Sequence, residues 1–402
     1  MVAALRPPGG FPVVGVVGGG QLARMMQPPA VALGVQLRVL AEAPDASAAL
    51  VVASAPVGEH TDADAVTAFA RDVDVLTFDH EHVPTALLES LEAGGVLVRP
   101  GPAALVHAQD KVAMRRRLTQ LGVPCPRCDV VHDAAELDAF AEQVGWPLVL
   151  KTPRGGYDGK GVLLARSRED ARPWLDRLAS APAGPGGQRP ALLAEEAVSF
   201  SRELAVLVAR SAMGQAAAWP VAETVQVDGV CSEVIAPAPG LDRDFAARAT
   251  EIGLRIAGAL GVVGVLAVEM FQTVPGPDDA GAGLLVNELA MRPHNSGHWT
   301  IDGSVTSQFE QHLRAVLDLP LGDPRPRAPW SVMVNVLGGQ EPDLYRAYLH
   351  VMARDPALKV HLYGKGVRPG RKLGHVTVCG DDLDDLRERA RHAADYITGG
   401  PR

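Results

Sequence analysis

Two glutamates and an asparagine interrupt a pair of apolar segments near residue 280. Glu269 lies within residues 262–272, and Asn287 and Glu288 lie within residues 283–289. The short turn between these segments predicts an antiparallel hairpin, which would place the carboxylates side by side. Acids in apolar strands are costly to bury unless they bind cations, and Mg²⁺ binds through one or two carboxylates together with substrate phosphates. The pattern therefore favours a magnesium site over two satisfied buried acids.

The glycine-rich loop LKTPRGGYDGKGV at residues 150–162 is a second candidate for chemistry. Apolar runs on both sides predict a hairpin, whereas a P-loop needs GxxxxGK[ST] at the start of a helix and Lys160 is followed by Gly161. Glycine lets the backbone approach a ligand closely, and backbone N–H groups bind anions. We expect a flap that covers phosphates, with a mobile hairpin tip as the alternative.

Two further polar groups are candidates for ligand binding, one directly after the acidic hairpin and one in the C-terminal part of the chain. Arg292, His294, Asn295 and Ser296 follow the acidic hairpin directly, where a second substrate would bind. The second group is a cluster of cations with glycines among them: Lys365, Arg368, Arg371 and Lys372. Such a cluster is either a solvated face or an anion site.

The N-terminal segment predicts a βαβ start, with a buried strand at residues 11–17 and a helix from Gln21. Gly18, Gly20 and Ala23 satisfy the dinucleotide pattern GxGxxA, and Glu42 follows the next strand. The pattern is weak, because the same turn serves any anion at a helix N-terminus and tight βα turns need glycine regardless.

The motif FDHEHVP follows a strand expected at residues 74–78, where α/β sheets bind ligands. His80 and His82 alternate as zinc ligands do, but no third ligand is evident, so we favour Glu81 facing a ligand instead.

The remaining periodicity predicts further elements. We expect strands at residues 51–53, 96–99, 192–198, 202–209, 215–219, 223–227, 331–337, 361–363 and 375–378, and helices at residues 103–121, 134–144, 242–260, 304–317 and 383–397.

Composition limits the class of protein. With 402 residues, two or three domains are expected, and a net charge of −9 argues against a nucleic-acid or anionic-membrane surface. The four cysteines are too few for a disulfide scaffold, and the lone pair Cys125/Cys128 predicts ordinary thiols. No signal-peptide core or membrane-length apolar run occurs, which predicts a cytoplasmic protein.

Several segments together resemble the ATP-grasp superfamily, and within it the N5-carboxyaminoimidazole ribonucleotide synthetase family. These segments are GGGQLARMM, FDHEHVP, KTPRGGYDGKG, EEAV, VEMF, VNELAMRPHNSGHWT and YGKGVRPGRKLGHVT. The resemblance implies an α/β and α+β fold in three parts: a Rossmann-like N-terminal domain at residues 1–106, a small lid at 107–190, and a large domain at 191–402. Residues 330–402 would pack toward the N-terminal domain. It also implies a homodimer.

The resemblance further implies the ligand contacts. ATP phosphates would meet Lys111 and Lys151 beneath a flap of Gly156, Tyr157, Asp158, Gly159, Lys160, Gly161 and Val162. Adenine would meet the backbone of Glu195, Glu196, Ala197 and Val198, and ribose would meet Glu203. Mg²⁺, with Mn²⁺ as a substitute, would bind Glu269 and Glu288, with Asn287 beside them.

The second substrate would be aminoimidazole ribonucleotide, bound by Gly20, Gln21, Leu22, Glu81, Ser296, Lys365, Arg371 and Lys372. The reaction centre would be lined by Tyr157, Asp158, Lys160, Arg292, His294, Asn295 and Ser296. Some relatives have a histidine where Gln226 stands, and we assign Gln226 no role.

The activity implied is ATP-dependent carboxylation of the ribonucleotide amine by bicarbonate through carboxyphosphate. Arg292 and Lys365 would stabilise anions, and the base that accepts the amine proton is not identified. Three rivals remain: a related ligase using formate and glycinamide ribonucleotide, a nicotinamide oxidoreductase, and a non-catalytic ATP-binding protein.

Overall fold

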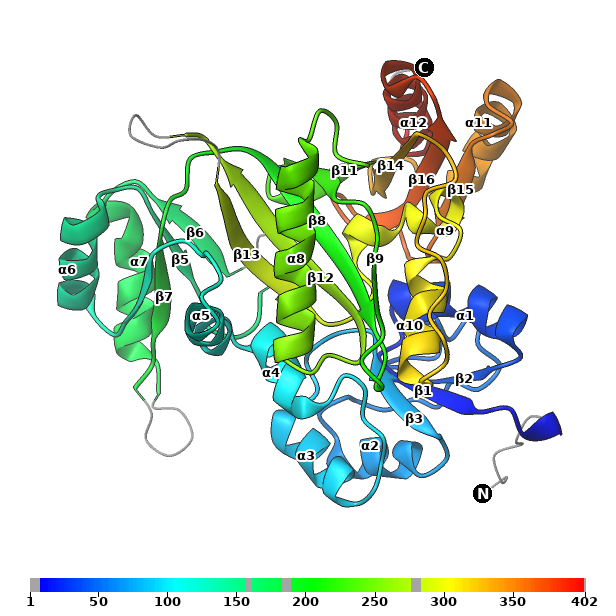
Figure 1. The fold of residues 1–402 in the computed structure, drawn as a ribbon, viewed down its shortest axis with the longest axis horizontal. Coiled ribbons are helices and arrows are strands. Elements are labelled where there is room, and N and C mark those ends of the chain that lie inside the picture. Colours follow the sequence, from blue (N-terminus) through cyan, green and yellow to red (C-terminus); the bar gives the residue numbers. More distant parts are fainter. Residues whose placement is uncertain (1–7, 157–160, 183–188, 276–282, 401–402) are drawn as a thin grey trace.

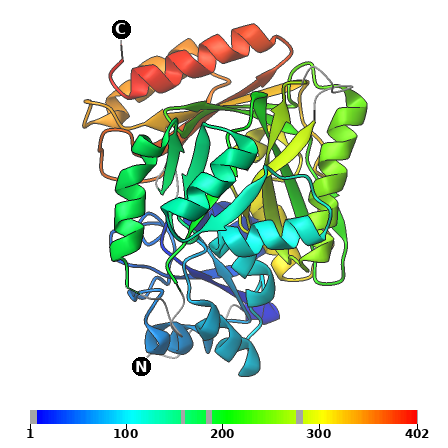
Figure 2. The ribbon, with the colours of Figure 1, turned by 90° about the vertical axis from the view of Figure 1, so that its left-hand side faces the viewer.

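Three β-sheets organise the chain, and Figure 1 shows them in separate parts of the molecule. The computed structural model describes residues 8–156, 161–182, 189–275 and 283–400. Figure 2 shows the N-terminal domain and the C-terminal helix α12 (Leu383–Ile397) at opposite ends. Within the described ranges, no helix is long and apolar enough to cross a membrane.

The N-terminal domain contains a parallel sheet in the order β2-β1-β3. Its central strand is fully buried, as its apolar sequence predicts. The elements are β1 (Val13–Val17), α1 (Gln21–Leu33), β2 (Gln36–Leu40), α2 (Ala63–Ala70), β3 (Val75–Phe78) and α3 (Thr85–Ala93), after a short 3₁₀ turn at Pro8–Gly10.

Two strands expected in this domain do not form. Residues 51–53 lie in a helical turn, because Val51 and Val52 both donate to the carbonyl of Ala48. Residues 96–99 form only an isolated bridge to β3 at Leu76.

The lid contains an antiparallel sheet in the order β4-β7-β5-β6, with α6 and α7 packed on its apolar face (Figure 1). Its elements are β4 (Cys128–Val131), α6 (Ala134–Val144), β5 (Leu148–Lys151), β6 (Val162–Ala165), α7 (Arg168–Ser180) and β7 (Leu192–Glu196). Strand β7 lies beyond residue 190, so the lid sheet extends past the boundary expected there.

One helix expected at residues 103–121 is two helices, α4 (Pro102–Gln109) and α5 (Lys111–Gln120). Asp110 separates them in an extended conformation, and its carboxylate caps α5 by accepting from Ala113 N at 3.0 Å. This break places Lys111 at the start of a new helix.

The large domain is built on a nine-stranded sheet in the order β13-β12-β8-β10-β11-β14-β16-β15, with β9 paired to β8. Its strands are β8 (Phe200–Arg210), β9 (Ala216–Ala218), β10 (Ala222–Val227), β11 (Val230–Ala236), β12 (Gly264–Thr273), β13 (Leu284–Ala290), β14 (Trp330–Leu337), β15 (Lys359–Leu362) and β16 (Lys372–Gly380). Its helices are α8 (Arg243–Ala259), α9 (Thr300–Gly303), α10 (Gln308–Val316), α11 (Tyr348–Arg354) and α12.

The helix expected at residues 304–317 begins later, at Gln308, because Ser307 caps it by accepting from Glu310 N. Helix α10 packs beside α1 (Figure 1), in one core with it. The C-terminal segment also reaches the N-terminal domain, where Ser47 Oγ donates to Tyr363 O at 2.6 Å. The site described next lies where these parts meet.

Candidate active site

The acidic pair lies on neighbouring strands of the large sheet. Glu269 on β12 is directly opposite Glu288 on β13 in antiparallel register. The next paired residues are Met270 and Val286, so Asn287 is an additional residue in β13 and forms a β-bulge. The sequence predicted the pairing of the two carboxylates, but not the bulge.

The surroundings of Glu269 disfavour a negative charge on its carboxylate. Burial, with Glu288 and Glu203 nearby, raises its pKa to about 8. His294 Nε2 lies 3.4 Å from Glu269 Oε1, but burial lowers the pKa of His294 to about 3, so the imidazole is neutral. Ser296 N donates to His294 Nδ1 at 3.3 Å, which leaves the ring hydrogen on Nε2, facing Glu269.

Two lysines from the lid side reach the acidic hairpin. Lys111 Nζ, at the start of α5, lies 3.2 Å from Glu288 Oε1. Lys151 Nζ, at the end of β5, donates to Asn287 Oδ1 at 3.1 Å and lies 2.7 Å from Glu195 Oε2. These contacts bring the predicted phosphate lysines and the predicted metal residues into one site.

Arg115 is a residue of this site that the sequence did not single out. Its side chain is 2% exposed, and Nε donates to Glu195 Oε1 at 2.5 Å. Its spacing of four residues from Lys111 places both on one face of α5. That spacing was the available signal, but Arg116 and Arg117 adjoin Arg115 in the run RRR.

The segment expected to hold adenine, residues 195–198, begins with the last two residues of β7. The Glu195 side chain is buried in the ion pairs just described. Glu196 N donates to Arg127 O at 2.9 Å, and its carboxylate binds Arg127 Nε at 2.7 Å. Ala197 N makes a long 3.4 Å bond to Pro147 O. Val198 follows outside the strand.

The predicted ribose and flap residues lie around this segment. The Glu203 carboxylate on β8 is hydrogen-bonded by Gln226 on β10, so Gln226 contacts a predicted site residue. Gly156 and Gly161 have positive φ angles of 80° and 73°, which suit glycine, and Val162 begins β6. Tyr157, Asp158, Gly159 and Lys160 lie outside the described residues.

A second polar group connects the N-terminal domain to the loop after β13. Arg292 Nε lies 2.8 Å from Glu81 Oε2. Glu81 Oε1 is buried and has no hydrogen-bond partner among the described residues. Lys365 Nζ donates to Gln21 Oε1, and Arg371 Nη1 donates to Gly366 O at 3.1 Å. The positive charge of Lys372, at the start of β16, partly opposes the rise in the pKa of Glu269 and adds to the fall in the pKa of His294, which places this charge near the acidic pair.

Three predicted site residues have side chains engaged within the protein. Leu22 is buried in the core beside α1. Asn295 is buried and its amide pairs with that of Asn335 at 2.8 and 3.0 Å. Ser296 is buried, with Oγ 2.9 Å from His294 Nδ1. A ligand would therefore meet Leu22 through its backbone, while Asn295 and Ser296 stabilise the loop.

The glycine turn before α1 is occupied by the protein's own carboxylates. Asp79 Oδ1 accepts from Ala23 N at 2.7 Å, and Glu42 Oε2 accepts from Gly19 N at 3.1 Å. Gly18 has a φ of 104°, and a Cβ on Gly20 would overlap Asp79 Oδ2. Since these acids take the place of a pyrophosphate at the helix N-terminus, the turn does not favour a dinucleotide.

The histidines of FDHEHVP acquire a third neighbour, His60, whose ring centroid lies 4.7 Å from that of His80. His80 Nε2 lies 3.6 Å from Glu42 Oε1, and His82 N donates to His80 Nδ1. In the described part of the chain, no group of His, Cys, Asp or Glu is arranged to hold a metal through three or more side chains.

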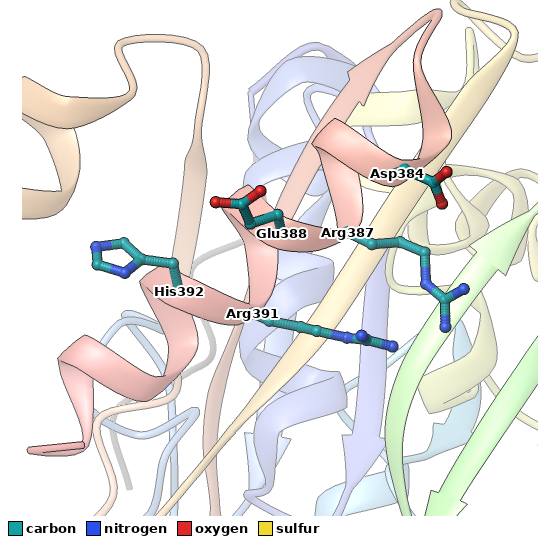
Figure 3. Close-up of a pocket in the computed structure, with 5 residues that line it drawn as sticks. All are labelled: Asp384, Arg387, Glu388, Arg391 and His392. Carbon is teal, nitrogen blue, oxygen red and sulfur yellow. The ribbon is translucent and has the colours of Figure 1, made fainter. Parts of the chain in front are cut away.

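A hollow of about 420 Å³ is lined by residues of α12 alone and contains none of the predicted site residues (Figure 3). Its cations, Arg387 and Arg391, each bind the buried Glu233 at 2.7 Å. None of the cations of the anion site expected from the sequence lines this hollow, so it is not that site: Lys365, Arg368, Arg371 and Lys372.

Comparisons with known protein families identify the domains of this chain. Residues 116–309 match the ATP-grasp domain, and residues 12–109 match the ribonucleotide synthetase preATP-grasp domain. Residues 331–389 match the phosphoribosylaminoimidazole carboxylase C-terminal domain. The fold and site therefore define an ATP-grasp ligase, as the resemblance predicted.

Individual relatives are more specific. The chain is 54% identical over 392 residues to N5-carboxyaminoimidazole ribonucleotide synthase of Mycobacterium tuberculosis, covering 97% of this chain and 88% of the relative. The Corynebacterium ammoniagenes enzyme of that name is 49% identical, with 96% and 92% covered. The chain belongs to the N5-carboxyaminoimidazole ribonucleotide synthase family.

A solved structure extends the similarity to the fold. The synthase of Aspergillus clavatus, in complex with ADP and 5-aminoimidazole ribonucleotide, matches with a TM-score of 0.84 and 34% identity. The match covers 96% of this chain and 98% of that one. The synthetase of Thermus thermophilus matches with a TM-score of 0.82 and 38% identity, covering 96% and 99%.

Proposed function

We propose that this chain carboxylates 5-aminoimidazole ribonucleotide, using ATP and bicarbonate, to N5-carboxyaminoimidazole ribonucleotide, ADP and phosphate, a step of purine biosynthesis. The observation that carries the proposal is the near-full-length identity of 54% to a synthase of that name. The contacts of Lys111 and Lys151 with the acidic hairpin support the ATP half of the reaction.

The phosphates would lie between these lysines and the acidic pair. Glu269 and Glu288 fit a divalent cation, because they face each other and the pKa of Glu269 is raised to about 8 by burial beside other acids. Mg²⁺, or Mn²⁺ in its place, would be held by these carboxylates with Asn287 beside them, and it would neutralise phosphate charge. His294, as a neutral donor, orients Glu269.

Lys111 and Lys151 stabilise the negative charge on the γ-phosphate as bicarbonate attacks it. The product, carboxyphosphate, hydrolyses readily, so the flap at residues 156–162 is assigned the exclusion of water. Carboxyphosphate then releases CO₂, which the exocyclic amine of the ribonucleotide attacks. Tyr157, Asp158 and Lys160 of the flap are assigned to this reaction centre.

The ribonucleotide would bind where the N-terminal domain meets the loop after β13. Lys365, Arg371 and Lys372 supply positive charge for its phosphate, and Gln21 is already held by Lys365. Glu81 has one carboxylate oxygen on Arg292 and a second without a partner among the described residues, which suits a substrate N–H. Arg292 would stabilise the carboxylated anion.

The test measures ADP release from Mg-ATP with each pair of co-substrates. We expect release that requires both 5-aminoimidazole ribonucleotide and bicarbonate, with ¹³C-bicarbonate carbon appearing in the product by NMR. Release with formate and glycinamide ribonucleotide alone would show the related ligase instead. ATP binding without ADP formation under any condition would show a non-catalytic protein.

The proposal includes a cytoplasmic homodimer, which rests on the family resemblance. Sedimentation of the purified chain distinguishes a monomer of 42.2 kDa from a particle of twice that mass.

A further inference from the structure

Arg115 connects three elements of the nucleotide site. From α5, its side chain extends between β7 of the lid and β13 of the large sheet. Nε donates to Glu195 Oε1 at 2.5 Å, Nη1 to Val286 O at 3.0 Å, and Nη2 to Asn287 O at 2.8 Å. One planar guanidinium thus binds a carboxylate in one sheet and two backbone carbonyls in another.

The two carbonyls belong to the bulge in β13. This strand is at the end of the nine-stranded sheet, so its outer edge lacks a neighbouring strand in that sheet. Pro124 O accepts from Val286 N at 2.8 Å, and Arg115 donates to the carbonyls of Val286 and Asn287. Arg115 therefore supplies hydrogen-bond donors to two carbonyls of this strand, at an edge that no neighbouring strand of the sheet covers.

The bulge decides where the next side chains point. Asn287, the additional residue, directs Oδ1 to Lys151 Nζ at 3.1 Å, and Glu288 contacts Lys111 Nζ at 3.2 Å. Bulges next to active sites commonly re-aim a side chain in this way. A change in the backbone at residues 286–287 would shift both the amide and the carboxylate.

Arg115 also alters the charge balance around Lys151. Glu195 is buried and binds both cations, with Lys151 Nζ 2.7 Å from Oε2. The neighbouring thiol of Cys125 adds no anion, because burial raises its pKa to about 11. One carboxylate shared by two cations leaves positive charge for a phosphate.

We propose that Arg115 is a positioning residue of the nucleotide site, which fixes the bulge that aims Asn287 and Glu288 and shares Glu195 so that Lys151 retains charge for a phosphate. The inference rests on the proposed function only in that the site binds a nucleotide. It requires no particular second substrate.

The test compares Arg115→Met and Arg115→Lys with Arg116→Met, a change at the exposed neighbour on the same helix. Calorimetry with Mg-ADP measures nucleotide binding without the ribonucleotide. We expect Arg115→Met to raise the Kd by about tenfold or more, as the loss of supporting contacts does in metal sites. Arg115→Lys should recover part of this, since it pairs with Glu195 but cannot reach both carbonyls. Arg116→Met should match the parent.

Steady-state kinetics separate positioning from a general structural defect. Arg115→Met should raise the KM for ATP and lower kcat, with the KM for the ribonucleotide nearly unchanged. A lower kcat with both KM values unchanged would indicate only a smaller folded fraction and would overturn the proposal, as would an unchanged ADP Kd in folded Arg115→Met. Should Arg115→Met fail to fold, an unchanged ADP Kd in Arg115→Lys overturns it equally.

ADP binding also distinguishes this proposal from the proposed function. Loss of ADP affinity in Arg115→Met supports the positioning role even if the parent does not carboxylate the ribonucleotide. If the parent carboxylates the ribonucleotide but the ADP Kd is unchanged in Arg115→Met, only the positioning role of Arg115 is overturned.

Discussion

Glu269 lies directly opposite Glu288 across β12 and β13, and the pKa of Glu269 is raised to about 8. Two acids are thereby held side by side in one hairpin, with Lys111 against Glu288 and the neutral His294 against Glu269. The arrangement is unfavourable without a further cation. It therefore indicates a site prepared for a charged ligand rather than for stability.

Removing one acid should abolish metal-dependent turnover. Glu288→Gln keeps the size of the side chain but removes the charge, so we expect ATP turnover to fall by roughly 100-fold or more. Circular dichroism should show an unchanged fold. Glu251→Gln, on the exposed face of α8, is the matched control. Near-normal turnover in Glu288→Gln would remove the metal assignment.

Binding of the ribonucleotide through its phosphate should depend on Arg371. A charge-assisted hydrogen bond contributes about 1.5–3 kcal/mol, so Arg371→Ala should raise the KM for the ribonucleotide roughly tenfold or more. The KM for ATP should change much less. Arg368→Ala, at an exposed cation of the same loop, provides the comparison. Equal effects on both substrates would place the phosphate elsewhere.

The turn before α1 should not tolerate a side chain at Gly20. A Cβ there would overlap Asp79 Oδ2, and this carboxylate binds Ala23 N. We expect Gly20→Ala to cost about 1–3 kcal/mol of stability, as overpacking does, and to raise the KM for the ribonucleotide. Thermal unfolding and kinetics measure the two effects.

Gly258 offers a control of the same type. A Cβ on Gly258 has no heavy atom within 4 Å outside its own helix, α8. Gly258→Ala should therefore stabilise the protein by about 0.5–1 kcal/mol. If Gly20→Ala stabilised the protein as Gly258→Ala does, the close contact between Gly20 and the Asp79 carboxylate would not limit the residue at position 20.

His312 should contribute a pH-dependent stability. It accepts from Val265 N at 3.1 Å and bonds Thr77 Oγ1 at 2.8 Å, joining the large sheet to the N-terminal domain. Burial lowers its pKa from 6.5 to about 3. The unfolded chain therefore binds the proton more readily, so stability is present above pH 6.5 and is lost as the pH falls toward 3, by up to about 1.4 kcal/mol per pH unit.

His312→Gln retains an acceptor and a donor but does not titrate. Its destabilisation relative to the parent should therefore shrink as the pH falls from 6.5 to 4.5, as measured by thermal unfolding. Other buried histidines act equally in both proteins, so the difference isolates His312. A constant difference across this range would contradict the prediction.

Local patterns determined much of the site. Short stretches of sequence encode the hairpin containing Glu269 and Glu288, the flap hairpin and the start of helix α1 at Gln21. In such stretches, strand length and turn composition decide the structure. Lys111 and Lys151 were identified through the family's motifs. Residues 383–397 were also predicted to be helical, with the boundaries of α12.

The tertiary structure alone decided which residues meet. Lys365 and Gln21 are 344 positions apart, and Arg115 and Glu195 are 80 apart, so no local period relates them. Strand β7 joined the lid because its partners are β4 and β5. Arg115 differs from Arg116 and Arg117 only in the direction it faces from α5. The sequence determined which charges are present, whereas burial and long-range packing decided which of them share a site.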